Sequence, residues 1–253
     1  MIKKVGILDS GLGGLTVLQE LLEKCPRGEY IYLADNQYLP YGEKTTEELR
    51  ERGKLICRFF REKKIDLLVL ACNTITATAL DVFEKELQIP VYGVIEYGAK
   101  DALTRSKNKK IALLATERTV KSKAYDRYLK KSLEFMAIPC PELVFYAEEG
   151  IIEGPELEKS IAKSMEPIFQ KNMDTVIWGC THYPVLKKVF DQLGPKIQYI
   201  DPAKATVEAV ARKITPSDEG KVDFYTTKID KEYPRIIHAL FGISGIRMKK
   251  IKI

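Results

Sequence analysis

Two segments of the chain repeat a pattern that could carry chemistry. In each, an Asp precedes a strand-like apolar run and a Cys follows that Asp by six residues: Cys72 after Asp66, and Cys180 after Asp174. The repeat predicts two related units, each presenting a thiol at the carboxyl end of a strand. Parallel α/β sheets bind their ligands at those ends. We therefore expect one thiol on each side of a shared cleft.

Two opposed thiols would supply the base and the acid that are needed to invert an amino-acid α-carbon without a cofactor. Because a free Cys has a pKa of about 8.5, a helix N-terminus or a nearby donor would make it a usable base at neutral pH. Asn73 and Thr74 follow the first Cys, and Thr181 and His182 follow the second. We expect these residues to open helices, lower the thiol pKa values and bind a carboxylate.

The histidines and the other cysteines receive different interpretations. His182 stands two residues after Cys180 and could tune that thiol or shuttle its proton, whereas His238 is interpreted as structural. The remaining thiols, interpreted as small buried hydrophobes, are Cys25, Cys57 and Cys140. Irregular spacing without a Cys-x-x-Cys pair indicates reduced thiols. A zinc site built from Cys72, Cys180 and His182 is an alternative, although paired ligand spacing is missing.

A glycine-rich turn, Asp9-Ser10-Gly-Leu-Gly-Gly14, follows the first strand-like run and precedes a helical pattern. Glycines at such a turn let backbone amides approach an anion closely. The spacing departs from G-x-G-x-x-G, and Asp35 is only an approximate match for a ribose-binding acid. We therefore predict carboxylate binding rather than dinucleotide binding at this turn.

Three further segments each allow a structural and a functional interpretation. Pro40-Tyr41-Gly42 is typical of a turn. Thr116 and Thr119 follow an apolar run and fit ordinary helix capping. Glu148 belongs to an acidic pair before a glycine, and it is either a surface charge or the carboxylate that orients an imidazole.

Short β-branched or leucine-rich runs alternate with amphipathic stretches of helical length, which is typical of an α/β fold with mostly parallel strands. The predicted strands are 4–8, 30–34, 67–71, 91–94, 111–115, 144–146, 175–178, 198–200 and 222–225. Because the two Cys units are similar, we predict two similar α/β domains with the active site in the cleft between them.

Composition narrows the functional classes. The 253 residues are 45% hydrophobic, as expected of a globular chain, and the longest apolar runs have strand length, which argues against a membrane span. The net charge of +6 is spread over short clusters without interleaved aromatics, so nucleic acid is not an expected partner. The N-terminus lacks the apolar core of a secretory signal, so we expect a cytoplasmic protein.

Five motifs occur along the chain in an order that resembles the glutamate racemases, within the aspartate/glutamate racemase superfamily. They are 9–17, Pro40-Tyr41-Gly42, Ala71-Cys72-Asn73-Thr74, Gly93-Val94-Ile95-Glu96 and Gly179-Cys180-Thr181-His182-Tyr183-Pro184. The resemblance covers nearly the whole chain, and the two cysteine motifs are its most specific part.

The resemblance implies roles for particular residues. Cys72 would be the base for the D enantiomer and Cys180 the base for the L enantiomer. Asp9 and His182 would assist the two thiols, and Glu148 would support His182. The implied substrate contacts are Asp9, Ser10, Tyr41, Gly42, Asn73, Thr74, Thr116, Thr119, Thr181 and His182.

The resemblance also implies an architecture and a role. Residues 1–97 together with 211–253 would form the domain that carries Cys72, and residues 98–210 the domain that carries Cys180. Glutamate would be the substrate, with no pyridoxal phosphate, no other cofactor and no metal. The D-glutamate would serve peptidoglycan synthesis, and the enzyme would be a homodimer.

The chain departs from the usual family pattern at three places. Ile75 replaces an Ala, Tyr97 replaces a Pro, and a Tyr occupies position 38 in the segment before the Pro-Tyr-Gly turn. We expect these changes to lie near the cleft and to affect substrate choice. The alternatives are a sister racemase for aspartate or another amino acid, a weakly active homologue that binds a partner protein, and a metal-dependent hydrolase.

Overall fold

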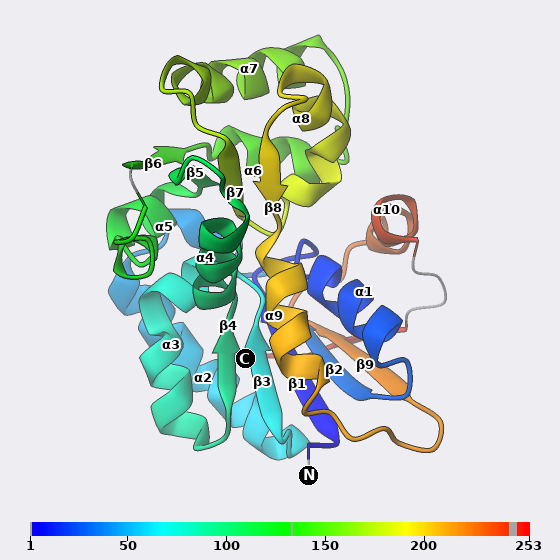
Figure 1. The fold of residues 1–253 in the computed structure, drawn as a ribbon. Helices are drawn as coiled ribbons and strands as arrows, with labels where there is room; N and C mark the ends of the chain where they lie inside the picture. Colours follow the sequence, from blue (N-terminus) through cyan, green and yellow to red (C-terminus); the bar gives the residue numbers. More distant parts are fainter. Residues whose placement is uncertain (1, 133, 243–246) are drawn as a thin grey trace.

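The computed structural model describes residues 2–132, 134–242 and 247–253 and contains two parallel sheets, one above the other in Figure 1. The first sheet has the order β10-β9-β2-β1-β3-β4, and the second has the order β6-β5-β7-β8. The strands of the first sheet are β1 (Lys4–Asp9), β2 (Glu29–Ala34), β3 (Leu67–Leu70), β4 (Val91–Gly93), β9 (Lys221–Thr226) and β10 (Met248–Lys250). Those of the second are β5 (Lys110–Ala115), β6 (Glu134–Pro139), β7 (Thr175–Gly179) and β8 (Gln198–Ile200). The predicted α/β fold with two parallel-sheet units is confirmed.

Helices cover both faces of the first sheet. They are α1 (Leu15–Lys24), α9 (Pro202–Ala211) and α10 (Tyr233–Phe241) on one face, and α2 (Thr46–Lys63) and α3 (Asn73–Leu87) on the other. Side chains alternate between the two faces along each strand: Ile7 of β1 packs with the α1 side, and Leu8 packs with the α2 side. This alternation within nearly continuous apolar runs is expected of a parallel sheet buried on both faces.

The second sheet is enclosed in the same way. One face packs on α6 (Glu142–Glu148), α7 (Pro155–Gln170) and α8 (Lys187–Leu193), and the other packs on α4 (Val94–Arg105). The remaining short elements are α5 (Glu117–Ser122), η1 (Tyr41–Glu43), η2 (Tyr125–Arg127) and η3 (Tyr183–Leu186). No helix in the described ranges is both long and apolar enough to cross a membrane.

The chain passes between the sheets at α4 and α9, which contact each other. Because α9 also packs on α1 while α4 packs on β7, both helices belong to the junction as much as to either half. The proposed domain limits, 1–97 plus 211–253 and 98–210, therefore stay predictions. Residues 1 and 243–246 of the first domain lie outside the described residues.

One predicted strand is wrong. Residues 144–146 lie within α6, where Leu143 and Ala147 at helical spacing are the buried residues. The strand that pairs with β5 is instead β6, an edge strand whose half-exposed side chains weaken the hydrophobic pattern. Strand β10 was also not predicted, because the strand has only three residues and most of them are exposed.

Helix α2 begins at a capping box. The Thr45 hydroxyl accepts the Glu48 amide at 3.1 Å, and the Glu48 carboxylate accepts the Thr45 amide at 2.7 Å. With the helix beginning at this position, Arg52 lies on the side of α2 that faces the loop after β2. Arg52 forms a two-point ion pair with Asp35, through Nη2 to Oδ1 at 2.6 Å and Nε to Oδ2 at 2.8 Å.

Hydrogen bonds connect the Asp35–Arg52 ion pair to three other parts of the chain. Asp35 is fully buried and also accepts hydrogen bonds from Tyr41 Oη at 2.7 Å and Thr227 Oγ1 at 3.0 Å. Arg52 Nη1 donates to the Ile253 carbonyl at 2.8 Å. The pair therefore holds the loop after β2 against α2 and the segment after β9.

We expect Arg52→Met to lower the free energy of unfolding by about 3 to 5 kcal/mol, because it leaves a buried carboxylate without its cation. Arg61→Met is the matched control, since the Arg61–Glu86 pair is largely exposed and contributes at most about 1 kcal/mol. Urea unfolding of both variants and the wild type measures the difference. Equal losses for the two variants would contradict the importance of the Asp35 site.

Candidate active site

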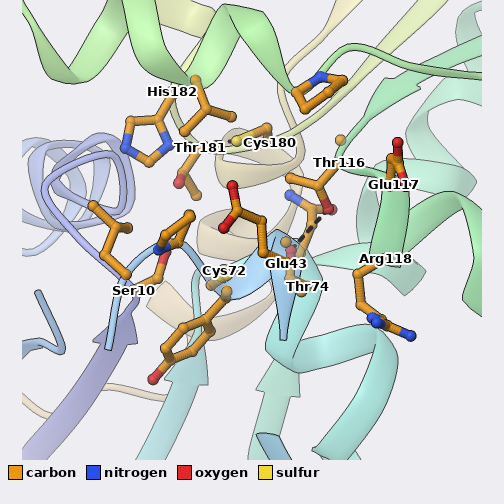
Figure 2. Close-up of a pocket in the computed structure, with 18 of the residues that line it drawn as sticks. Ser10, Glu43, Cys72, Thr74, Thr116, Glu117, Arg118, Cys180, Thr181 and His182 are labelled. Atoms are coloured by element: carbon orange, nitrogen blue, oxygen red, sulfur yellow. Dashed lines mark hydrogen bonds between the residues drawn. The ribbon is translucent and has the colours of Figure 1, made fainter. Parts of the chain in front are cut away.

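A cavity of about 640 Å³ lies where the carboxyl ends of β1, β3, β5 and β7 approach one another. Figure 2 shows Cys180, Thr181 and His182 in the upper part of this cavity and Ser10, Cys72 and Thr74 in the lower part. Most of the predicted site residues line it, namely Ser10, Tyr41, Gly42, Cys72, Asn73, Thr74, Thr116, Glu148, Cys180, Thr181 and His182. Asp9 and Thr119 lie directly behind the wall and contact residues that form it. His238 lies on α10 and is not among the lining residues.

Cys72 occupies the N-cap position of α3, immediately after β3, and its side chain is almost completely buried. Burial raises the pKa of the Cys72 thiol to about 12, and the nearby Asp9 carboxylate adds to the effect. The Ile75 amide and the Ser10 hydroxyl act in the opposite direction. The expected lowering of this pKa is therefore wrong, because the desolvation of the buried thiol outweighs the helix N-terminus.

Cys180 stands just after β7 and has a different neighbour. Its Sγ lies 3.4 Å from His182 Nδ1, and the other ring nitrogen, Nε2, makes a short hydrogen bond to Glu148 Oε1. Burial opposes a charge on His182, but Glu148 and Cys180 together raise its pKa well above 6.5. The Cys180 sulfur therefore lies beside an imidazole ring whose charged form is favoured. Only the short η3 turn and α8 follow this Cys, rather than the single helix that was expected.

The Asp9 carboxylate accepts hydrogen bonds from the glycine-rich turn that follows it. Its Oδ2 accepts the amides of Gly11 at 3.1 Å and Gly14 at 3.0 Å, and its Oδ1 accepts the Thr181 hydroxyl at 3.3 Å. The Gly11 and Gly14 amides are therefore occupied by the chain's own carboxylate, and the binding of a ligand carboxylate at the rest of the turn stays a prediction. Burial raises the pKa of Asp9, although His182 and both amides oppose that shift.

The glycine at position 13 allows the two halves to meet closely. A Cβ on Gly13 would lie 2.5 Å from the Thr181 hydroxyl and 2.8 Å from the Thr181 carbonyl carbon. No larger residue fits at this contact without moving the backbone after β7. The turn after β1 thus supports the loop that carries Cys180.

Three threonine hydroxyls form a second contact between the halves. Thr74 Oγ1 and Thr116 Oγ1 are 3.0 Å apart, as are Thr116 Oγ1 and Thr119 Oγ1. Thr116 also caps α5 by accepting the Thr119 amide at 3.3 Å. The capping interpretation and the site interpretation of Thr116 are therefore compatible, because the same hydroxyl lies at the cavity wall.

Sequence reasoning missed part of the wall. The additional lining residues are Leu39, Pro40, Glu43, Glu117, Arg118, Lys121, Pro141, Val144, Phe145 and Gly179. Glu117 and Arg118 could have been inferred, because they directly follow Thr116 in the chain. The lining residues between Pro141 and Phe145 could not have been inferred, because their side chains reach the cavity only when this segment forms helix α6.

The three departures from the family pattern do not line the cavity, although Tyr38 packs against Tyr41 and Ile75 directly follows Thr74, and both of those residues line it. Ile75 is completely buried in the core between the first sheet and its helices, and only its amide acts on Cys72. Tyr38 packs beneath the Arg52 guanidinium, and Tyr97 packs against Tyr92. The side chains of Ile75, Tyr38 and Tyr97 therefore pack outside the cavity wall.

In the ranges that the structure describes, no group of three or more His, Cys, Asp or Glu side chains is arranged to hold a metal ion. The alternative zinc site of Cys72, Cys180 and His182 therefore has no support from the geometry. The ion pair of His182 with Glu148 occupies the ring nitrogen that faces away from Cys180.

Comparison with known proteins places the fold and the site in a class. A sequence model described as Asp/Glu/Hydantoin racemase matches residues 6–210. The chain is 38% identical to a glutamate racemase of Aquifex aeolicus over 240 residues, which cover 94% of each protein. Among solved structures, a glutamate racemase from Bacillus anthracis superposes with a TM-score of 0.92 at 29% identity, covering 99% of this chain and 98% of that one.

A second solved structure, a glutamate racemase from Francisella tularensis in complex with D-glutamate, superposes with a TM-score of 0.91 at 25% identity, covering 99% of this chain and 97% of that one. The two-sheet fold and the shared cavity thus define an enzyme of the amino-acid racemase class. The chain belongs to the Asp/Glu/Hydantoin racemase family.

The His182–Glu148 pair generates a prediction about pH. Because the pKa of His182 is raised, the stabilisation from its charge is present at low pH and is lost as the pH rises past 6.5 and through the raised value. Glu148→Gln removes the main favourable partner but leaves the burial, so the His182 imidazole should titrate at a lower pH. NMR titration measures this, with His238→Gln to assign the two imidazole signals. An unchanged titration would contradict the coupling.

Proposed function

We propose that this protein interconverts L- and D-glutamate without a cofactor, by proton transfer between the substrate α-carbon and two thiols. The observation that carries the proposal is that Cys72 and Cys180, each at the end of a strand in a different sheet, line one cavity. The names of the similar proteins support glutamate as the substrate.

In the L-to-D direction, Cys180 acts as the base. The His182 imidazolium, held by Glu148, stabilises the Cys180 thiolate before it takes the α-proton. Cys72 retains its proton because burial keeps its pKa at about 12, so it is the acid that protonates the opposite face.

In the D-to-L direction, Cys72 must first lose its proton. The buried Asp9 carboxylate acts electrostatically on Cys72, and its own pKa is raised, which makes it a better proton acceptor than an ordinary carboxylate. We propose that Asp9 assists Cys72 as His182 assists Cys180. The two thiols would then work with unlike partners, one an anion and the other a cation.

The substrate carboxylates would be bound by neutral donors in the cavity wall. Asn73 and Thr74 open α3, and their amides and side chains face the same space as the Ser10 and Thr181 hydroxyls. Tyr41 and Gly42 close the cavity from the side of η1, and Thr116, supported from behind by Thr119, completes the wall on the side of α5. Helix α3 adds the positive end of its dipole.

The sequence resemblance also supports a proposal for the use of the product, the cellular compartment and the oligomeric state. The D-glutamate would supply peptidoglycan synthesis. The enzyme would act in the cytoplasm as a homodimer.

Activity is tested with purified protein and L-glutamate in deuterated buffer without pyridoxal phosphate. We expect optical rotation to decay to zero while the α-proton exchanges for deuterium. If glutamate is unchanged, a panel of other amino acids, beginning with aspartate, tests the sister-racemase alternative. Failure of the whole panel would favour the alternative of a partner-binding homologue.

Single thiol replacements test the mechanism. Cys72→Ala and Cys180→Ala should each lower racemisation by about 10³-fold or more, because one face loses its acid or base. Cys72→Ala should still exchange the α-proton of L-glutamate, and Cys180→Ala that of D-glutamate. The control Cys25→Ser should keep near wild-type turnover. Racemisation by either alanine variant at the wild-type rate would exclude the two-thiol mechanism.

A further inference from the structure

A buried hydrogen bond connects the two halves of the molecule beside the cavity. Tyr125, the first residue of η2, donates its hydroxyl to Asn73 Oδ1 at 2.7 Å. Both side chains are almost fully buried, at 1% and 2% exposure. The Tyr125 ring packs in the core between α4 and the second sheet, whereas Asn73 is the first residue of α3 beside the first sheet.

The direction of this hydrogen bond follows from the chemistry of the hydroxyl. Burial raises the pKa of Tyr125, and the nearby Asp201 and Cys180 add to the effect, so the hydroxyl keeps its proton. Among the described residues, the Asn73 oxygen is the only acceptor for that proton. If Tyr125 instead accepted from the amide nitrogen, its proton would be buried without a partner, which is unfavourable.

The amide of Asn73 is therefore oriented. With Oδ1 occupied, Nδ2 lies on the other side of the amide group, and Asn73 is one of the residues that line the cavity. No residue in the described parts accepts a hydrogen bond from Nδ2, although the group has two protons to donate. A carboxylate of a bound ligand is the acceptor that this donor suits.

We propose that Tyr125 is a positioning residue that holds the Asn73 amide with its N–H groups toward the cavity, ready for a carboxylate of the substrate. The inference rests on the proposed function, and it adds a residue that does not line the cavity. A planar amide can turn by half a rotation when nothing holds it. In the turned state its oxygen would face the substrate carboxylate and repel it.

Tyr125→Phe removes the hydroxyl and keeps the ring. We expect KM for glutamate to rise about 10-fold, the lower end of what a hydrogen bond to a charged group contributes. The value of kcat should change by less than about 3-fold, because the lost contact is made equally in the ground state and the transition state. A variant that was misfolded, or that was impaired in the chemical step, would show a lower kcat as well.

Tyr199→Phe is the matched control. The Tyr199 hydroxyl donates to the Phe190 carbonyl at 2.8 Å on the far side of the second sheet, and Tyr199 does not line the cavity. Each variant loses one tyrosine hydroxyl from the same half of the protein, so thermal unfolding should respond similarly in both. Only Tyr125→Phe should raise KM.

A double replacement tests whether Tyr125 acts through Asn73. In an Asn73→Ala background, Tyr125→Phe should have no further effect on KM, because the amide that it positions is gone. A wild-type KM for Tyr125→Phe, or a full effect that persists in Asn73→Ala, would overturn the inference while leaving the racemase proposal intact. Absence of glutamate turnover in the wild type would instead overturn the proposed function.

Discussion

The burial of several ionisable groups around the cavity constrains how the surrounding elements must be arranged. Asp9, Cys72 and His182 lose contact with bulk water, so each is controlled by its few immediate neighbours. Asp9 is surrounded by two backbone amides and a hydroxyl, and His182 lies between a thiol and a carboxylate. The strands, turns and caps around the cavity are arranged to supply those neighbours. A buried charge without such partners would destabilise the fold.

The same constraint makes the two thiols unlike one another, although their sequence contexts are similar. Cys72 is surrounded by apolar core and an anion, which favour the protonated form. Cys180 instead lies beside the His182 imidazole, whose pKa is raised by Glu148 and by Cys180 itself. Such unlike surroundings suit the proposed two-thiol mechanism, in which one thiol takes a proton while the other gives one.

The two halves meet through polar contacts as well as through α4 and α9. Thr181 with Asp9, Thr74 with Thr116, and Tyr125 with Asn73 are hydrogen bonds between elements that belong to different sheets. Since all are buried at the cavity, the geometry of the site depends on how the halves are placed. Such contacts explain why a residue such as Tyr125 can affect the site without lining it.

Local sequence patterns were enough to predict the alternating α/β fold and the position of both thiols at strand ends, because strand-like runs and strand-end motifs are local features. Most of the other site residues were predicted from the resemblance to a known family. The sequence did not reveal that α6 is a helix, since three apolar residues fit either period when the partners are unknown. The resemblance implied that Glu148 supports His182, and the structure places the two side chains in contact. That Asp9 binds the amides of its own glycine turn, and that burial raises the pKa of the Cys72 thiol, became clear only from the folded structure. Those properties arise from burial and from contacts between residues far apart in the chain, and neither is encoded in local spacing.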